Sequence, residues 1–250
     1  MSKSDPKKVL VTICSKNPSY YNLSTNIQYF QKFLENYDYL ISIVDSDSTT
    51  FTEYRKVNDS YPNVKIHYVR NENYEYGAYK YSYETYPDYD IYICIQDTVL
   101  FSDDVDIDIV TNDHSIIFKH DSGFLLDRNT IPFSMEVLEK SPFEHENYIM
   151  GDRETFKNYW KKKKSLVKDR EEYQKFINDN IYIFDICVHS TFIVTNNVMK
   201  DIFRTLTIPP TCKLHSRAYE RLFGLYFIHR NIKTTDLKKF NVKKYHGGRN

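Results

Sequence analysis

The sequence has little glycine, no paired cysteines, no net charge and no long apolar run. Only 6 of its 250 residues are glycine, and the segment "CSKNPSYYN" that follows the first strand-like stretch contains none. Nucleotide-binding enzymes of the P-loop and dinucleotide-binding types place a glycine-rich, phosphate-binding loop at this point. Such a loop is therefore excluded here.

The four cysteines, Cys14, Cys94, Cys187 and Cys212, are far apart in the sequence, and none forms a CxxC pair. This spacing argues against a structural zinc site and against a disulfide framework. Three of the four lie in apolar, strand-like runs. We interpret them as small buried hydrophobic residues in a reducing compartment.

Charge and hydropathy exclude further classes of partner. The 34 basic and 34 acidic side chains cancel, so no overall field recruits nucleic acid or an anionic membrane. The N-terminal "MSKSDPKKVL" lacks the apolar core of a signal peptide, and no window approaches the roughly 18 apolar residues of a membrane helix. We expect a soluble, cytoplasmic protein. The abundance of Tyr, Asn, Ile and Lys is typical of an AT-rich coding genome, viral or bacterial.

What the sequence does contain is a regular alternation of strand and helix patterns over its first hundred residues. Strands are predicted at 9–14, 39–45, 64–69 and 89–95, and helices at 22–37, 52–62 and 77–87. This alternation predicts βαβ units, and therefore an α/β fold with a mostly parallel central sheet flanked by helices. In such sheets ligands bind at the carboxyl ends of the strands.

Beyond Ser102 the pattern becomes irregular and mixed. A long charged stretch at 151–180 has helical periodicity, 181–195 is strand-like and 218–231 is again helical. No repeat or low-complexity linker divides the chain. We therefore predict one domain over residues 1–250, with a ligand-binding half at 1–102 and a mixed second half at 103–250.

Two carboxylates come directly after predicted strands. Asp97 follows the apolar strand in "DIYICIQDTVLF", and a rigid carboxylate there could hold Mg²⁺, which takes one or two protein carboxylates together with phosphate oxygens and waters. Its side chain could instead cap a turn. Asp45 could accept hydrogen bonds from a nucleobase or a ribose, or it could cap the next helix, as Asp47, Ser48 and Thr49 also could. We expect one of these four residues to cap the helix and another to bind.

Three segments that surround these positions resemble motifs of GT-A-fold glycosyltransferases, notably the large inverting family 2. "IVDSDST" resembles that family's V-D-[ND]-[GD]-S-T segment, and "IQDTVL" is similar to its N-x-D-T-x-L version of the metal-binding D-x-D motif. "NENYEYGAYKYSYE" resembles the stretch that leads from the third strand into the following helix. The matches occur in the expected order between Val9 and about Ser102. The later segment "HSTFIVTNNVMKDIF" is weakly similar to the strand and short helix that line the acceptor side in that family.

The sequence also departs from the family at two positions. Ile95 stands where the family usually has its first acidic or amide ligand, so metal dependence is not established by the motif. Asn73 replaces the glycine that follows the third strand, and asparagine can adopt a positive φ less readily than glycine does.

The resemblance implies a GT-A-like, Rossmann-like fold with a nucleotide-sugar donor that lies across the strand tips. We expect this donor to be a UDP-sugar. Asp97 would hold Mn²⁺ or Mg²⁺ against the diphosphate, and His246 in "KKYHGG" would be a further ligand. Arg70 or Lys80 could add fixed positive charge. The residues expected on the donor are Thr12, Cys14, Asp45, Asp47, Arg70, Lys80, Gln96 and Asp97.

An inverting transfer also needs a carboxylate that takes the proton of the acceptor hydroxyl. The resemblance favours Glu220 in "SRAYERLFGLYF", and Asp152 and Asp185 are the competing candidates; each could equally be a salt-bridged or helix-end carboxylate. The acceptor would be a glycan or a glycoprotein hydroxyl, and the chain could act as a homodimer. The alternatives are a nucleotidyltransferase and a catalytically inactive sugar- or nucleotide-binding module.

Overall fold

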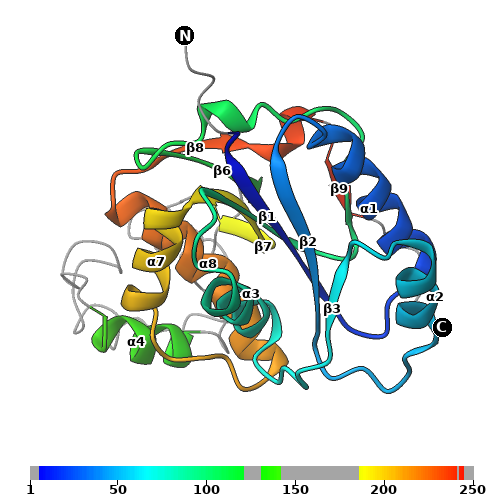
Figure 1. Ribbon diagram of the computed structural model, residues 1–250. Helices are drawn as coiled ribbons and strands as arrows, with labels where there is room; N and C mark the ends of the chain where they lie inside the picture. Colours follow the sequence, from blue (N-terminus) through cyan, green and yellow to red (C-terminus); the bar gives the residue numbers. More distant parts are fainter. Residues whose placement is uncertain (1–5, 121–130, 142–185, 241, 245–250) are drawn as a thin grey trace, which may run out of the picture.

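The computed structural model describes residues 6–120, 131–141, 186–240 and 242–244 (Figure 1). The strands of the main sheet are β1 (Lys8–Ser15), β2 (Asp38–Asp45), β3 (Lys65–His67), β4 (Ile91–Gln96), β6 (His114–His120), β7 (Ile186–Thr195) and β8 (Lys233–Asp236). The α-helices are α1 (Tyr20–Phe33), α2 (Thr52–Ser60), α3 (Tyr74–Thr85), α4 (Ile131–Glu139), α7 (Asn196–Thr205) and α8 (Lys213–His229).

The main sheet has seven strands in the order β3-β2-β1-β4-β7-β6-β8. Parallel pairing joins β1 to β2, β1 to β4, β2 to β3 and β6 to β8, whereas β7 runs antiparallel to both of its neighbours. The predicted α/β class with a mostly parallel sheet is therefore confirmed. The antiparallel strand comes from the second half, which was predicted to be mixed.

Helices cover both faces of the sheet (Figure 1), and the alternation of side chains along β1 explains how. Val9, Val11 and Ile13 of β1 belong to one buried cluster, which includes the apolar side chains of α1 and α2. Leu10 and Cys14 belong to the other cluster, which is built with α3, α4, α7 and α8. One strand therefore supplies the two halves of the core.

The predicted elements of the first half all form, with shifted ends. Helix α1 buries Leu23, Ile27 and Phe30 at the spacing that the sequence shows, and α3 begins at Tyr74, ahead of the predicted start. In the second half α8 begins at Lys213 rather than 218. The predicted helix at 151–180 lies outside the described residues.

The last described segment returns to the middle of the chain. Strand β9 (Lys243–Lys244) pairs antiparallel with β5 (Val99–Leu100), which follows β4 directly. Cys14, Cys94 and Cys187 are buried as predicted, and Cys212 is exposed. Within the described ranges no helix is long and apolar enough to cross a membrane.

Candidate functional site

Successive strands are added first on one side of β1 and then on the other. Strands β2 and β3 lie on one side of β1 and β4 lies on the other, so a topological switch point falls between the carboxyl ends of β1 and β4. The register sets Ser15 opposite Asp45 and Cys14 opposite Gln96. The N–H of Asp97 then donates to the Cys14 carbonyl at 3.0 Å, which fixes Asp97 at the switch point.

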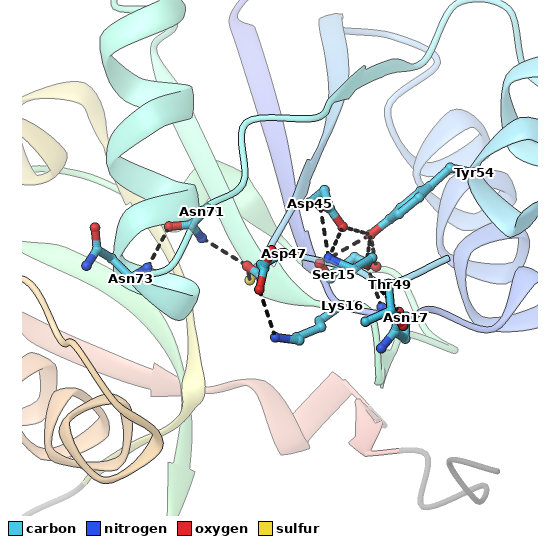
Figure 2. Close-up of polar contacts among 12 residues, drawn as sticks. Ser15, Lys16, Asn17, Asp45, Asp47, Thr49, Tyr54, Asn71 and Asn73 are labelled. Atoms are coloured by element: carbon cyan, nitrogen blue, oxygen red, sulfur yellow. Dashed lines mark hydrogen bonds and ion pairs between the residues drawn. The ribbon is translucent and has the colours of Figure 1, made fainter. Parts of the chain in front are cut away.

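A chain of hydrogen bonds joins Asp45 to Asp97, and its first part, from Asp45 through Tyr54 to Ser15, is drawn in Figure 2. The hydroxyl of Tyr54, on α2, donates to Oδ1 of Asp45 at 2.9 Å and lies 3.1 Å from Oγ of Ser15. Ser15 in turn donates to Oδ2 of Asp97 at 3.3 Å. Asp45 and Asp97 are 1% and 6% exposed, so both carboxylates sit below the surface of the strand edge.

Asp45 is held by its own loop. The N–H of Ser48 donates to both of its oxygens, at 3.2 and 3.1 Å, in addition to the Tyr54 hydroxyl. The helix that follows begins at Thr52 with Phe51 as its N-cap, and no side-chain hydrogen bond caps it. The expectation that Asp45, Asp47, Ser48 or Thr49 caps this helix was therefore wrong, because the loop extends for several residues before α2 begins.

The loops after β1 and β2 are tied to each other (Figure 2). Oδ1 of Asn17 accepts from the N–H of Thr49 at 2.8 Å, and the N–H of Asn17 donates to Oγ of Ser48 at 2.7 Å. Lys16 and Asp47 form an exposed ion pair at 3.7 Å. Asn17 and Asp47 have φ values of 47° and 62°, a conformation that Asn and Asp tolerate better than most residues. Asp47 therefore lies at the edge, paired with a cation.

The loop after β3 packs against the loop after β2 through Asn71. Its Nδ2 donates to Oγ of Ser46 at 2.9 Å, and its Oδ1 accepts from the N–H of Asn73 at 3.0 Å. Gly77 makes room for this amide, since a Cβ at position 77 would lie 2.1 Å from Oδ1 of Asn71. The positive φ expected near Asn73 falls instead on Tyr74, at 54°, whereas Asn73 has φ −96°.

Glu75, which the sequence analysis did not select, lies next to the switch point. It is 7% exposed, in the first turn of α3, and its two oxygens accept from Nε2 of Gln96 at 2.5 Å and from Oγ of Ser216 at 2.8 Å. A glutamate in the first turn of a helix is usual, since it complements the helix dipole. Nothing in the sequence pointed to Ser216, 141 residues away, as its partner.

Glu220, the predicted base, lies on α8 beside an irregular part of β7. His189 and Ser190 have φ values of 55° and 49°, and the register between β6 and β7 shifts there. The N–H of His189 donates to Oε1 of Glu220 at 2.9 Å, and the His189 ring lies 3.7 Å from that oxygen. Burial raises the pKa of Glu220, and the His189 N–H opposes this rise.

The other predicted site residues differ in burial and in their contacts. Thr12 is fully buried within β1, and Cys14 is buried with its sulfur 3.2 Å from Oγ of Ser46. Arg70 is exposed just after β3. Lys80 lies further along α3 and pairs with Glu84 at 3.8 Å, so it does not face the strand tips. Asp152, Asp185 and His246 lie outside the described residues.

The described residues do not complete a metal site by themselves. They contain no group of three His, Cys, Asp or Glu side chains that could hold a metal ion. Of the two predicted metal ligands, Asp97 is among the described residues. Strand β9 pairs with β5 through Lys244 and Val99, and Val99 is two residues after Asp97.

Comparison with protein-family models gave no match, and no characterised protein matches the sequence either. Among solved structures, the mannosyltransferase Ktr4p from S. cerevisiae matches with a TM-score of 0.43 and 14% identity. The match covers 89% of this chain and 62% of that one, so this chain spans less than two thirds of the yeast protein's length. A likeness of this size does not assign a family or an activity.

Proposed function

We propose that this chain is a glycosyltransferase of the GT-A type, which moves a sugar from a nucleotide-sugar donor to a hydroxyl group of a saccharide or protein. The three segments that resemble family 2 motifs come from separate parts of the chain. In the fold they lie at one edge of the sheet, after β2, β3 and β4, where parallel sheets bind nucleotides. A UDP-sugar is the proposed donor and inversion the proposed outcome, both through the resemblance.

The observation that supports this proposal is the hydrogen-bonded connection between the tip of β4, next to Asp97, and α8, which carries Glu220. Asp97 is held rigidly at the tip of β4 by Ser15 and by the Cys14 carbonyl. Glu220 comes from α8 and is linked to that tip through Ser216, Glu75 and Gln96. In this proposal Asp97 is the donor-side carboxylate and Glu220 the acceptor-side carboxylate, the two groups that a transfer between bound sugars requires.

In the proposed reaction Glu220 is the general base. The acceptor oxygen attacks the anomeric carbon as the bond from that carbon to the diphosphate breaks, and the acceptor proton passes to Glu220. A carboxylate whose pKa is raised by burial is a stronger base than an ordinary glutamate, provided it is ionised at the working pH. The N–H of His189 fixes the orientation of the accepting group.

The donor side requires positive charge against the departing nucleoside diphosphate. We propose that Asp97 holds Mn²⁺ or Mg²⁺ there, with His246 as a second ligand, and that the donor's phosphates complete the coordination. When bound, the ion would neutralise charge on the leaving group. Arg70, exposed after β3, is the proposed protein cation at the same edge, whereas Lys80 is paired with Glu84.

A thermal-shift panel of nucleotide sugars, each with and without Mn²⁺, tests the proposal. We expect a UDP-sugar to raise the melting temperature, and Mn²⁺ to increase that shift, since a ligand that binds the folded state stabilises it. Mn²⁺ alone is the control. A shift with free nucleoside triphosphates and none with nucleotide sugars would instead favour a nucleotidyltransferase. Binding of a UDP-sugar without turnover would favour an inactive binding module.

A further inference from the structure

We propose that Glu75 is a positioning residue for the transfer: it fastens the strand tip that carries Asp97 to the helix that carries Glu220. This inference rests on the proposed function. Glu75 belongs to neither of those elements, since it comes from the first turn of α3. It therefore connects the donor side of the site to the acceptor side through a third element.

The contacts of Glu75 reach both sides at once. Oε1 accepts from Nε2 of Gln96, the residue next to Asp97 in the chain, at 2.5 Å. Oε2 accepts from Oγ of Ser216 at 2.8 Å. Residues four apart on a helix lie on the same face, so Ser216 and Glu220 share one face of α8. A substitution at Glu75 therefore affects Gln96, which is next to Asp97, and Ser216, which lies on the same face of α8 as Glu220.

Burial makes this connection rigid. Glu75 and Ser216 are 7% and 4% exposed, and each of the two Glu75 oxygens accepts a hydrogen bond. A buried hydrogen bond to a charged group is stronger than one between neutral groups, and removal of one partner leaves the other without compensation. Glu75 is thus a partner that Gln96 and Ser216 share, and its two hydrogen bonds fix their separation.

Glu75 also acts on Glu220 through its charge. The groups that face Glu220 are Glu75 from α3, His189 and Cys187 from β7, and Lys213 and Arg221 from α8 itself. Among them the negative charge of Glu75 raises the pKa of Glu220, whereas Arg221 and Lys213 lower it. This effect acts through space and not through the hydrogen bonds to Gln96 and Ser216, so it supplies a separate measurement.

The experiment compares Glu75→Gln, Ser216→Ala and the matched control Glu84→Gln, an exposed glutamate of the same helix that pairs with Lys80. The titration of the Glu220 carboxyl is followed by ¹³C NMR in the absence of substrate. We expect its pKa to fall in Glu75→Gln and to stay near the wild-type value in the other two variants. An unchanged titration in Glu75→Gln would overturn the proposal, even in a chain without transferase activity.

Transfer kinetics give the second readout. Because a misplacement of about 1 Å can cost about a hundredfold in rate, we expect Glu75→Gln and Ser216→Ala each to lower kcat by about ten- to a hundredfold, with KM for the donor little changed. Glu84→Gln should match the wild type. Equal kcat in Glu75→Gln and Glu84→Gln would overturn the proposal. If Glu75→Gln lowers the pKa of Glu220 but the wild-type protein transfers no sugar, the result counts against the proposed function alone.

Discussion

At the scale of single residues, Tyr54 is the side chain on which the acidic edge depends. Its hydroxyl contacts Oδ1 of Asp45 and Oγ of Ser15, the residue that donates to Asp97. Its ring is fully buried, and this burial raises the pKa of its phenol, so the hydroxyl keeps its proton and remains a donor. One aromatic side chain of α2 therefore supports a buried carboxylate.

We expect Tyr54→Phe to lower the free energy of unfolding by about 1–3 kcal/mol, because Asp45 then stays buried with one donor fewer. Urea denaturation measures this loss. Tyr68→Phe is the matched control, since the Tyr68 side chain is 50% exposed, and it should change stability by less than about 0.5 kcal/mol. Equal effects of the two substitutions would show that the Tyr54 hydroxyl does not support the edge.

Gly77 offers a test in which the sign of the effect decides. In an ordinary helix interior alanine is more stable than glycine by about 0.5–1 kcal/mol. A Cβ at position 77 would instead lie 2.1 Å from Oδ1 of Asn71 and 2.7 Å from Cβ of Asn73. We therefore expect Gly77→Ala to destabilise the protein by about 1–3 kcal/mol in thermal or urea unfolding. A stabilising effect would mean that Asn71 does not pack against α3 in this way.

Glu220 makes stability depend on pH in a defined direction. Because its pKa is raised in the folded protein, the folded state binds more protons than the unfolded state between the ordinary and the raised pKa. The free energy of unfolding contributed by Glu220 therefore falls as pH rises through that interval. Glu220→Gln removes this titration and can still accept the His189 N–H.

We expect the free energy of unfolding of Glu220→Gln, relative to wild type, to increase as the pH is raised from about 4 to about 8. Urea unfolding of both proteins over this range measures the difference. A difference that stays constant with pH would contradict a raised pKa at Glu220. The Glu84→Gln variant controls for the loss of a carboxylate on the surface.

At the scale of elements, the irregular part of β7 is what brings a backbone donor to Glu220. His189 and Ser190 both have left-handed φ values, and neither is glycine. Such residues cost free energy unless the surrounding structure stabilises them, and they are concentrated at functional sites. The break in the β6–β7 ladder thus has a local consequence, namely the 2.9 Å hydrogen bond from the His189 N–H to Glu220.

In this part of β7 we expect valine, which usually favours β-strands, to be destabilising. We expect Ser190→Val to lower the free energy of unfolding by more than about 1 kcal/mol, because a β-branched side chain resists a positive φ. Thr234→Val in the regular strand β8 should change it by less than about 0.5 kcal/mol. Unfolding of both variants in urea provides the comparison. A neutral Ser190→Val would show that the residue is extended like the rest of the strand.

The elements also show which parts of the structure could be predicted from the sequence. The strands and helices of the first half follow from local apolar periods such as Leu23, Ile27 and Phe30 of α1. Asp45 and Asp97 were found because each follows a buried strand. The pairing of Glu75 with Ser216 and the left-handed pair in β7 depend on packing between distant segments. No local pattern reports such contacts. The helix cap expected after β2 failed because the loop extends for several residues before α2 begins.

At the scale of the whole molecule, the order of the strands explains why the first half of the chain supplies the proposed donor side. Strand β1 pairs with β2 and with β4, and this arrangement sets the tips of β1, β2 and β4 side by side. The second half adds β7 beyond β4, and α8 packs on β7 over the face that also holds α3. Glu220, the proposed base on α8, is thereby carried by a helix on the same face of the sheet as α3.

The most direct test of this account is the release of nucleoside diphosphate from a UDP-sugar by the wild-type chain and by Asp97→Asn, with Mn²⁺ and an acceptor present. Asp104→Asn, in the exposed loop after β5, is the matched control. We expect turnover by the wild type and by Asp104→Asn, and a loss of at least about a hundredfold in Asp97→Asn, because the donor side then lacks its carboxylate. Turnover that is unchanged in Asp97→Asn would contradict the central claim that the donor reacts at the switch point of the sheet.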